Sequence, residues 1–283
     1  MIISPQQVVE YYEKCEVAYR DVWDLNNSLA MHYGYWDASV RRLPQSLHRM
    51  NEVLAQVACV RRGERVLDAG CGVGGSAIFL AKQYGCEVEG ITLLETQVQK
   101  AIVYAQQRGV SDKVRFSVQD YTQTGFEARS FDLVWAVESV CHAIDKQAFL
   151  QEAYRLLKKG GRLLVADGFC TDKALSPKES ALLLTWTSNW AIPHLASVHS
   201  FEHKIRQVGF QAVNFQDFTP NIFPSSRRLY FFAHLALLYG YLCKLVGKPY
   251  GNPHTIANTR GAKAQYQALK RGLWKYGVFV AKK

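Results

Sequence analysis

A glycine-rich segment, VLDAGCGVGG at positions 66–75, is the stretch best suited by residue type to hold a ligand. An apolar run ends at Asp68, and four glycines follow it within seven positions. Glycine permits a backbone with positive φ and lets the main chain approach a bound molecule closely. The spacing of Gly70, Gly72 and Gly75 also fits the dinucleotide fingerprint, but glycine-rich turns recur in many folds. The segment therefore predicts a ligand-binding turn and leaves the ligand open.

The charge beside this turn bears on the identity of the ligand. A dinucleotide would place its pyrophosphate at the N-terminus of the following helix, where backbone N–H groups favour an anion. The carboxylate of Asp68 suits instead a ligand with an amino group and a sulfonium, such as S-adenosylmethionine (SAM). Glu89 stands about 20 residues further on, where a ribose-binding carboxylate is expected. After the next predicted strand, Asp120 could accept from an adenine amino group, and Tyr121 could pack against the ring or in the core.

Ionisable side chains follow two further apolar runs, at Glu138 and His142 in VESVCHA and at Asp167 in VADGF. A hydroxyl or amine that accepts a methyl group needs a base, and a carboxylate four positions from an imidazole suits acid–base chemistry. An alkene carbon would instead become a carbocation, which aromatic faces or a carboxylate stabilise. Glu138 closes so apolar a strand that a role in the core is disfavoured. His142 is either a base or a structural histidine, and Asp167 is either a second base or a turn-capping carboxylate.

Short apolar runs alternate with helical patterns from Val66 onward, which is typical of a parallel sheet with crossover helices. Helices are expected over Gly75–Tyr84, 94–108 and 146–157, and the KKGG sequence at 158–161 is expected to form a helix stop and a tight turn. Strands are expected over the following ranges: Arg65–Ala69, Glu87–Thr92, Val114–Val118, Phe131–Val137, 162–169, 213–218 and 276–281.

This alternation predicts an α/β fold with a Rossmann-like, seven-stranded, mostly parallel sheet, helices on both of its faces and an α-helical lid. Ligands bind beyond the carboxyl ends of the strands in such sheets, so segments that leave that edge are lid candidates. The expected division is an N-terminal helical cap (1–60), a SAM-binding core (61–170), a core continuation with a lid segment (171–219), a helical lid insertion (220–272) and a final core strand (273–283).

Six segments in order resemble the class I SAM-dependent methyltransferases, and over residues 30–170 the chain looks most like sterol C-methyltransferases, tocopherol methyltransferases and cyclopropane-fatty-acid synthase relatives. They are HYGYWD, VLDAGCGVGG, GITLLETQ, DYTQTGF, FDLVWAVESVCHAIDK and LLKKGGRLLVADGF. The resemblance implies SAM as cofactor and S-adenosylhomocysteine as product. It implies that Gly70 and Gly72 contact the methionine part of SAM, that Ile91, Thr92 and Gln97 hold the ribose region, and that Asp120 and Tyr121 frame the adenine. The GIT-L-x-x-x-Q pattern of this subgroup weakens the case for Glu89.

Aromatic residues indicate a lipophilic acceptor. In MHYGYWD, Tyr33 is a catalytic candidate, while His32, Tyr35 and Trp36 resemble the aromatic entry motif of the sterol and tocopherol enzymes or else belong to the core. Trp186, Trp190 and Phe231 are the substrate candidates in the expected lid, a region that departs most from those families.

The sequence thus predicts a SAM-dependent methyltransferase of an isoprenoid, sterol-like or prenylated ring compound, with carbon favoured as the acceptor atom. Methylation of oxygen or nitrogen in a natural product is the alternative. A catalytically silent SAM-binding or membrane-docked module is a hypothesis of another class. Replacing Glu138 by Gln should stall carbon methylation at a trapped cation or a diverted product. This result would partly separate carbon methylation from methylation of oxygen or nitrogen.

Composition narrows the choice of partners. The chain has 34 Lys and Arg against 24 Asp and Glu, a net charge of +10, but no recognised nucleic-acid motif accompanies the basic residues. Cys and His residues lack metal-ligand spacing, and seven cysteines without a CxxC pair indicate a reduced, cytoplasmic protein. The apolar run 229–246, with Arg227 and Arg228 before it, is either a lid helix or a peripheral membrane contact through 227–246. Oligomeric state is not predicted.

Overall fold

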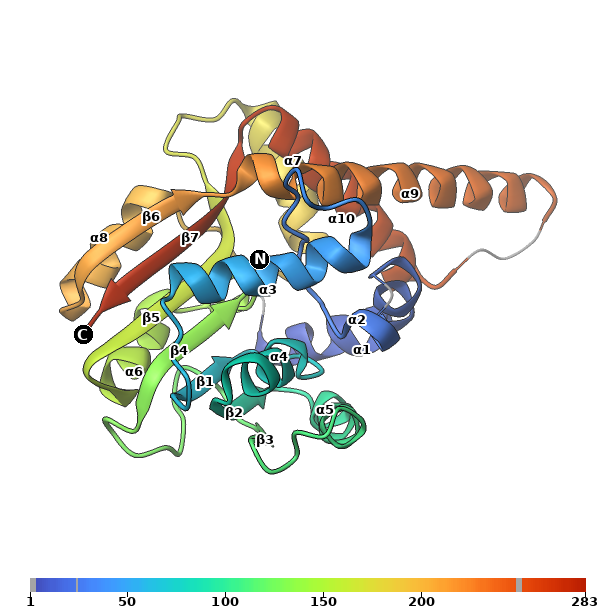
Figure 1. The fold of residues 1–283 in the computed structure, drawn as a ribbon. Coiled ribbons are helices and arrows are strands. Elements are labelled where there is room, and N and C mark those ends of the chain that lie inside the picture. Colours follow the sequence, from blue (N-terminus) through green and yellow to red (C-terminus); the bar gives the residue numbers. More distant parts are fainter. Residues whose placement is uncertain (1–3, 24, 248–250) are drawn as a thin grey trace.

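The computed structural model describes residues 4–23, 25–247 and 251–283, and its centre is one seven-stranded sheet. The strand order is β3-β2-β1-β4-β5-β7-β6, and only β7 runs antiparallel to its neighbours (Figure 1). The predicted Rossmann-like, mostly parallel sheet is therefore confirmed. The strands are β1 (Arg65–Ala69), β2 (Glu87–Thr92), β3 (Val114–Val118), β4 (Phe131–Val137), β5 (Leu157–Cys170), β6 (Gln211–Asp217) and β7 (Trp274–Lys282).

Alternate residues of the central strands face two separate hydrophobic cores. Leu133 and Trp135 of β4 belong to one core, and Val134 and Ala136 belong to the other. This alternation follows from the two-residue period of a strand, and burial on both faces explains the continuously apolar strand sequences. Helices cover both faces. They are α3 (Leu43–Val57), α4 (Gly75–Tyr84), α5 (Glu95–Gln107), α7 (Pro177–Asn189) and α10 (Pro253–Lys270) in the first core or beside it, and α6 (Lys146–Leu156) and α8 (Val198–Val208) in the second.

The boundaries of β5, β6 and β7 differ from the expected 162–169, 213–218 and 276–281, and β5 differs most. β5 begins at Leu157 and includes the KKGG segment that was expected to be only a turn. Leu157 pairs with Phe131, and the register then shifts before Arg162 pairs with Leu133, so the extra residues form an irregularity inside the ladder. Gly160, at φ 78°, donates its N–H to the carbonyl of Lys283, which fastens this irregularity to the end of the chain. β5 is therefore longer than its local turn residues predict, because it pairs with β4 and β7, which are distant in the chain.

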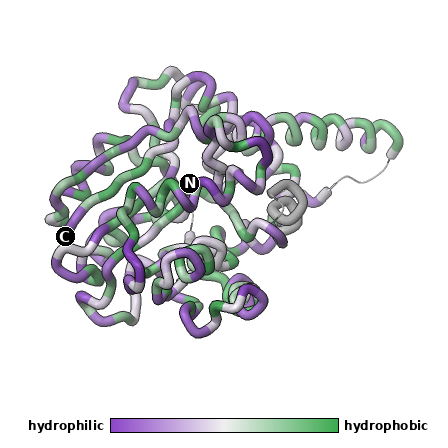
Figure 2. Tube along the Cα trace, in the orientation of Figure 1, coloured by the Kyte–Doolittle hydropathy of each residue, from purple (hydrophilic) through white to green (hydrophobic). Residues whose placement is uncertain are grey.

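Helices outside the alternation lie at both ends of the chain. The N-terminal region contains α1 (Pro5–Trp23) and α2 (Leu25–Ser28), and the C-terminal region contains the 27-residue α9 (Thr219–Leu245), which projects well beyond the sheet (Figure 1). Much of this projecting part is hydrophobic (Figure 2). Within the described ranges, no helix has both the length and the hydropathy required to cross a bilayer.

Candidate active site

The glycine turn between β1 and α4 is fastened to both neighbouring strands. The N–H groups of Gly70 and Cys71 both donate to the carbonyl of Ile91 in β2, each at 2.9 Å. Gly70 has φ 95°, and a Cβ atom there would lie 2.3 Å from the Cβ of Ser139, which follows β4. Only glycine meets both the positive φ and the close contact. The turn therefore has one conformation set by β2 and by the segment after β4.

Asp68 is buried at the end of β1, with 2% of its surface exposed, and lines a cavity beside this turn. Its carboxylate accepts the N–H of Ala77 in the first turn of α4, while Oδ2 has no hydrogen-bond partner among the residues described. Burial raises the pKa of Asp68 to about 7. A buried acceptor without a donor is costly, and a ligand amino group would supply the missing donor.

The cavity has a volume of about 260 Å³ and lies at the carboxyl ends of the central strands. Most of the residues predicted to bind the cofactor are part of its wall: Asp68, Gly70, Gly72, Thr92, Gln97, Asp120 and Tyr121. Ile91 and Glu89 are not. Ile91 is fully buried and contributes its carbonyl to the glycine turn, whereas Glu89 lies within β2 and pairs with Arg65 and Arg115. Glu89 lies three residues before the end of β2, away from the edge where ligands bind. Ile91 lies near that edge, but its side chain packs in the second hydrophobic core.

Thr92 and Gln97 form one side of the cavity. The Thr92 hydroxyl donates to Oε1 of Gln97 at 2.6 Å, and both side chains are largely buried. The Gln97 amide lies 3.9 Å from the sulfur of Met31, which also lines the cavity. This contact links the sheet edge to the N-terminal region.

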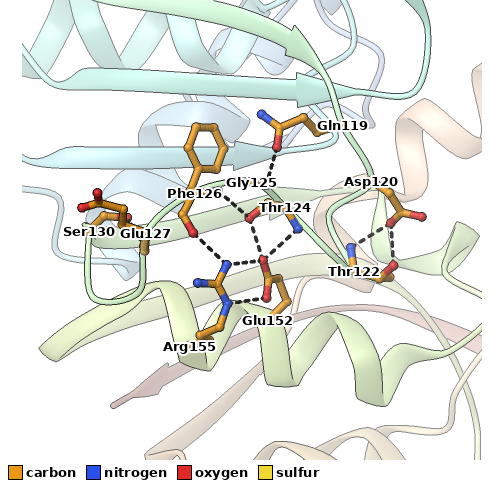
Figure 3. Close-up of polar contacts among 10 residues, drawn as sticks. All are labelled: Gln119, Asp120, Thr122, Thr124, Gly125, Phe126, Glu127, Ser130, Glu152 and Arg155. Carbon is orange, nitrogen blue, oxygen red and sulfur yellow. Dashed lines mark hydrogen bonds and ion pairs between the residues drawn. The ribbon is translucent and has the colours of Figure 1, made fainter.

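The loop after β3 carries Asp120 to the cavity and is fastened to α6 (Figure 3). Oδ1 of Asp120 accepts both the N–H and the hydroxyl of Thr122, at 2.8 and 2.7 Å. Further along, Thr124 donates its N–H and its hydroxyl to Glu152, which Arg155 holds through two bonds (Figure 3). The loop is thus fixed by interactions that the DYTQTGF motif shares with a distant helix.

Tyr121 packs across the same edge. Its hydroxyl donates to the carbonyl of Ser139 at 2.9 Å, and its ring meets the edge of Phe149 from α6. Burial raises the pKa of this hydroxyl well above its usual range. Tyr121 therefore packs against the protein and also faces the cavity, so the two roles considered for it are compatible.

Glu138 stands where the cofactor cavity meets a second, smaller chamber, and it lines both. Its backbone has φ 50°, a left-handed conformation that is rare for glutamate. Oε1 accepts the N–H of Tyr33 at 2.7 Å and the hydroxyl of Tyr276 at 2.9 Å. Burial nevertheless raises the pKa of Glu138 to about 8, since these two bonds only partly offset the loss of solvation. The carboxyl can therefore exchange a proton near neutral pH.

His142 also lines both spaces, and its hydrogen bonds define its tautomer. Nδ1 lies 3.0 Å from the carbonyl of Ala191, which can only accept, so the proton is on Nδ1. Nε2 is then an acceptor for the hydroxyl of Tyr12 on α1, also at 3.0 Å. Burial lowers the pKa of His142 to about 4. The imidazole is therefore neutral and connects α1 to the sheet edge.

Asp167 has the arrangement of a turn-capping carboxylate. Oδ2 accepts the N–H of Cys141 at 2.8 Å, and Oδ1 accepts the N–H of Gly168 at 2.7 Å. The first of these bonds holds η1 (Val140–His142), the short helical turn that carries His142. Burial raises the pKa of Asp167. These contacts show the capping role, and Asp167 also lines the second chamber, so a role as a second base stays a prediction.

The second chamber is small, about 50 Å³, and strongly aromatic. It shares Tyr12, Met31, Glu138 and His142 with the cofactor cavity, so those four side chains separate the two spaces. The other aromatic side chains of its wall come from four separate segments: Tyr11, Tyr33, Trp186, Trp190, Trp274 and Tyr276.

The chain is similar to known proteins in sequence and, for solved structures, in fold. The family model described as a methyltransferase domain matches residues 67–165. The chain is 35% identical to methyltransferase GfsG of Streptomyces halstedii over 57% of this chain and 58% of that protein. It is 27% identical to the tocopherol O-methyltransferase of Arabidopsis thaliana, over 98% and 81% of the two chains. With the sterol 24-C-methyltransferase of Saccharomyces cerevisiae the identity is 33%, over 62% and 46%.

The chain is a class I SAM-dependent methyltransferase. It is related to the tocopherol and sterol C-methyltransferases, and SAM is its cofactor. It spans only about half the length of GfsG and of the yeast sterol enzyme.

Solved structures show that the fold recurs across different activities. The [4+2]-cyclase SpnF has a TM-score of 0.80 at 22% identity, over 100% of this chain and 97% of that one. A geranyl diphosphate methyltransferase in complex with GPP and sinefungin has a TM-score of 0.76 at 21% identity, over 98% of each chain. At these identities the likeness concerns the fold alone.

The methyltransferase's predicted substrate residues divide into two groups. Trp186 and Trp190 line the aromatic chamber, as does the catalytic candidate Tyr33, while His32 lines the cofactor cavity. Tyr35, Trp36 and Phe231 line neither. Tyr35 packs on Phe218, the Trp36 indole N–H donates to Ser225 of α9, and Phe231 is 59% exposed on α9.

The described residues of the expected lid insertion, 220–247 and 251–272, contribute nothing to the walls of these two spaces. Its role at the site is support. Gln265 of α10 accepts the Tyr33 hydroxyl at 3.1 Å and that of Ser226 at 3.0 Å. The cover over the site comes instead from α1, which contributes Val8 and Tyr12 to the cofactor cavity, and from α7.

Several wall residues were missed by the sequence reasoning. Tyr12 lies in an N-terminal helix without a motif, and Tyr276 was expected only as the start of a strand. Gln119, one position before the recognised Asp120, lines the cavity and accepts the N–H of Gly125 (Figure 3). The run of polar residues after β3 was the one available signal, and it concerned Gln119 alone.

The cavity fits SAM in the chemistry of its wall. The orphaned Oδ2 of Asp68 matches an amino group, and the glycine turn leaves backbone rather than side chains facing the ligand. When bound, SAM supplies an electrophilic methyl group. Among the described residues, no cluster of His, Cys, Asp and Glu is arranged to hold a metal ion.

Proposed function

We propose that this methyltransferase methylates carbon in a lipophilic molecule of the isoprenoid, sterol-like or prenylated ring class. The observation that supports this most directly is the position of Glu138, a carboxyl between the cofactor cavity and an aromatic chamber. An alkene acceptor needs a base and cation-stabilising groups in one place, and few polar groups are present to recognise a sugar or peptide.

The chamber's aromatic rings suit a cationic acceptor. Trp274 lies 4.5 Å from Trp186 between ring centroids, and Tyr276 and Tyr33 meet edge to face at 5.9 Å. Ring faces attract a cation by about 0.5–2 kcal/mol each, more when water is excluded. In the proposed reaction the alkene π electrons form the new C–C bond as the C–S bond breaks, which leaves a cation on the acceptor.

Glu138 would then remove a proton from the carbon next to the cation and restore a C=C bond. Its proton-accepting form is the carboxylate, which Tyr33 N–H and Tyr276 O–H stabilise through Oε1. Two of the relatives, a sterol 24-C-methyltransferase and a tocopherol O-methyltransferase, agree with a lipophilic acceptor.

Methylation of oxygen or nitrogen is the second candidate, and His142 favours it. Its neutral Nε2 faces the boundary of the two spaces and could accept a proton from a hydroxyl or amine that displaced Tyr12. The O-methyltransferases among the relatives are consistent with this candidate. A silent SAM-binding module would show SAM affinity without turnover on any lipophilic extract.

Partners and location also remain proposals. We infer a small lipophilic substrate, no nucleic acid partner, a cytoplasmic location and a peripheral membrane contact through residues 227–246. The last of these agrees with the exposed hydrophobic part of α9 (Figure 2).

The test uses labelled SAM, fractionated lipid extract and mass analysis of the product, with Glu138→Gln compared to the wild type. Glutamine keeps the size of the side chain but cannot accept the proton, so turnover should fall about 100-fold or more, with a trapped cation or diverted product. Glu127→Gln is the matched control, because Glu127 is exposed and lies in neither wall. SAM affinity should be unchanged in both variants.

Product analysis separates the candidates. A methyl group on carbon in the wild type and a diverted product in Glu138→Gln support the proposal. A methyl group on oxygen or nitrogen, together with activity that is lost in His142→Gln and kept in Glu138→Gln, would favour the second candidate instead.

A further inference from the structure

The outer part of α9, residues 231–246 and hereafter the arm, exposes large hydrophobic side chains to solvent. Phe231, Leu238 and Leu242 are 59%, 56% and 51% exposed, and the arm projects beyond the rest of the molecule (Figures 1 and 2). The first part of α9 is different, because Ile222 and Leu229 are buried there. A large exposed apolar surface on a projecting helix generally marks an interaction site.

Five of the exposed apolar residues of the arm form a continuous stripe. Phe231, Leu235, Leu238, Leu242 and Leu245 follow each other at alternating intervals of four and three positions, which places them on one side of a helix. Arg227, also exposed, lies one turn before Phe231 on the same side. The stripe is therefore apolar along the arm and basic at its inner end.

The charge of this region favours one kind of partner. Residues 218–283 contain eleven Lys and Arg and no Asp or Glu, whereas residues 1–217 contain 23 basic and 24 acidic side chains. The whole positive excess of the chain thus belongs to the segment that carries the arm. Arg228, whose guanidinium lies 4.6 Å from the ring centroid of Phe232, and Lys244 add charge on the arm or beside it.

A second copy of the chain fits this surface poorly. Two arms packed stripe to stripe would bring Arg227, Arg228 and Lys244 of each copy near like charges with no acidic side chain between them, which is unfavourable. An anionic bilayer surface supplies both complements at once, because acyl chains can receive the stripe and phosphate groups can pair with the basic residues.

We propose that the arm lies in the headgroup region of an anionic phospholipid bilayer, with its apolar stripe inserted and its basic residues paired with lipid phosphates. The proposal names the partner for the membrane contact included in the proposed function. In that function, a lipophilic acceptor would enter the site from the bilayer, but attachment of the arm does not depend on which atom is methylated.

Sedimentation with vesicles tests the attachment. The full chain is mixed with vesicles of phosphatidylcholine alone or with about a third of phosphatidylserine, at low and high salt. We expect at least tenfold tighter binding to the anionic vesicles and a clear loss of binding at high salt, since each basic residue near the surface adds about 1 kcal/mol. Binding that is equal for both vesicle types, or absent from both, would overturn the proposal.

Two variants assign the binding to the arm. Leu238→Glu with Leu242→Glu should abolish it, and Arg227→Gln with Lys244→Gln should weaken it on anionic vesicles about tenfold or more. Val103→Glu on α5 is the control, because Val103 is 47% exposed away from the arm, and it should bind like the wild type. Equal loss in the control would refute a specific role for the arm. A chain that forms a dimer through the arm, detected by light scattering and lost in Leu238→Glu with Leu242→Glu, would favour the second copy instead.

Activity in two media keeps this proposal separate from the proposed function. The double-Glu variant should methylate a detergent-dispersed lipid extract at the wild-type rate and lose at least tenfold when the same extract is presented in anionic vesicles. Vesicle binding without methylation in either medium would leave the arm assignment in place and remove the proposed function.

Discussion

The two spaces of the active site are built in opposite ways. Most of the wall of the cofactor cavity comes from residues at or just after strand ends in the contiguous core, such as Asp68, Gly70 and Asp120. The aromatic chamber is lined by segments that are far apart in the chain: α1, the 29–36 segment, η1, β5, α7, the 192–195 segment and β7. The first is held by backbone bonds and glycine packing, and the second by ring contacts such as Trp186 on Trp274.

This difference explains how one fold can keep a donor site while its acceptor varies. The turn at Gly70 is constrained on two sides, by the carbonyl of Ile91 and by Ser139, so few changes are tolerated there. The chamber depends on the shape of side chains from irregular segments, which loops and helices outside the sheet can change without disturbing it. Glu138 and His142 belong to both spaces and connect them.

The largest effect should come from Gly70→Ala, which should disturb the cofactor cavity and leave the aromatic chamber unchanged. The new Cβ would lie 2.3 Å from the Cβ of Ser139, so the turn must move and SAM affinity should fall about 100-fold or more, measured by calorimetry. Gly109→Ala is the matched control: Gly109 has φ 70° but open space around it, so it carries the backbone strain without the clash. Equal SAM affinity in both variants would contradict the role of the Ser139 contact.

An intermediate effect is expected from Trp186→Phe in the aromatic chamber. Trp186 is 2% exposed and packs on Trp190 and Trp274, so a smaller ring should loosen the chamber and raise KM for the acceptor about tenfold. SAM affinity should stay unchanged, because Trp186 does not line the cofactor cavity. Trp36→Phe, which alters an indole outside both walls, should leave both constants as they are. A parallel loss of SAM affinity in Trp186→Phe would show that the aromatic chamber and the cofactor cavity are not independent.

The smallest effect concerns the pKa of Glu138, which lines both the cofactor cavity and the aromatic chamber. This pKa is raised from its usual value to about 8, so the carboxylate base forms only as pH rises. The kcat/KM for the acceptor should therefore increase about tenfold per pH unit up to roughly pH 8 and then level off. Tyr276→Phe removes a hydrogen bond that lowers this pKa. The rising part of the pH profile of kcat/KM should therefore move to higher pH by up to about one unit.

Tyr33→Phe is the control for that shift. Its hydroxyl donates to Gln265, whereas the bond to Glu138 comes from its backbone N–H, which the variant retains. The pH profile of Tyr33→Phe should match the wild type. A profile that does not respond to Tyr276→Phe would mean that Glu138 is not the group whose ionisation limits turnover.

Stability should respond to pH through the same carboxyl. Because the pKa of Glu138 is higher in the folded chain than its ordinary value of 4.5, the folded state binds the proton more tightly. This contribution to stability is complete below about pH 4.5 and is lost as pH rises to about 8.

The sequence by itself determined the parts that are local in the chain. The strand ranges of β1 to β4, the glycine turn and the run of wall residues from Thr92 to Tyr121 follow from short patterns, because a strand end, a turn and the start of a helix are set by neighbouring residues. The α/β class and the cofactor follow from the same patterns. Outside the HYGYWD motif, which indicated His32 and Tyr33, residues 1–60 and 171–272 carried no comparable period or motif to indicate which of them would face the site.

Only the tertiary structure decided the acceptor side. It placed Tyr12 of α1 on His142, Tyr276 of β7 on Glu138, and Gln265 behind Tyr33, contacts that join residues more than 100 positions apart. It also removed Tyr35, Trp36 and Phe231 from the walls and left the arm of α9 exposed. An aromatic side chain gives the same sequence signal in a core, in a cavity wall or on a surface, and packing among distant segments alone decides between them.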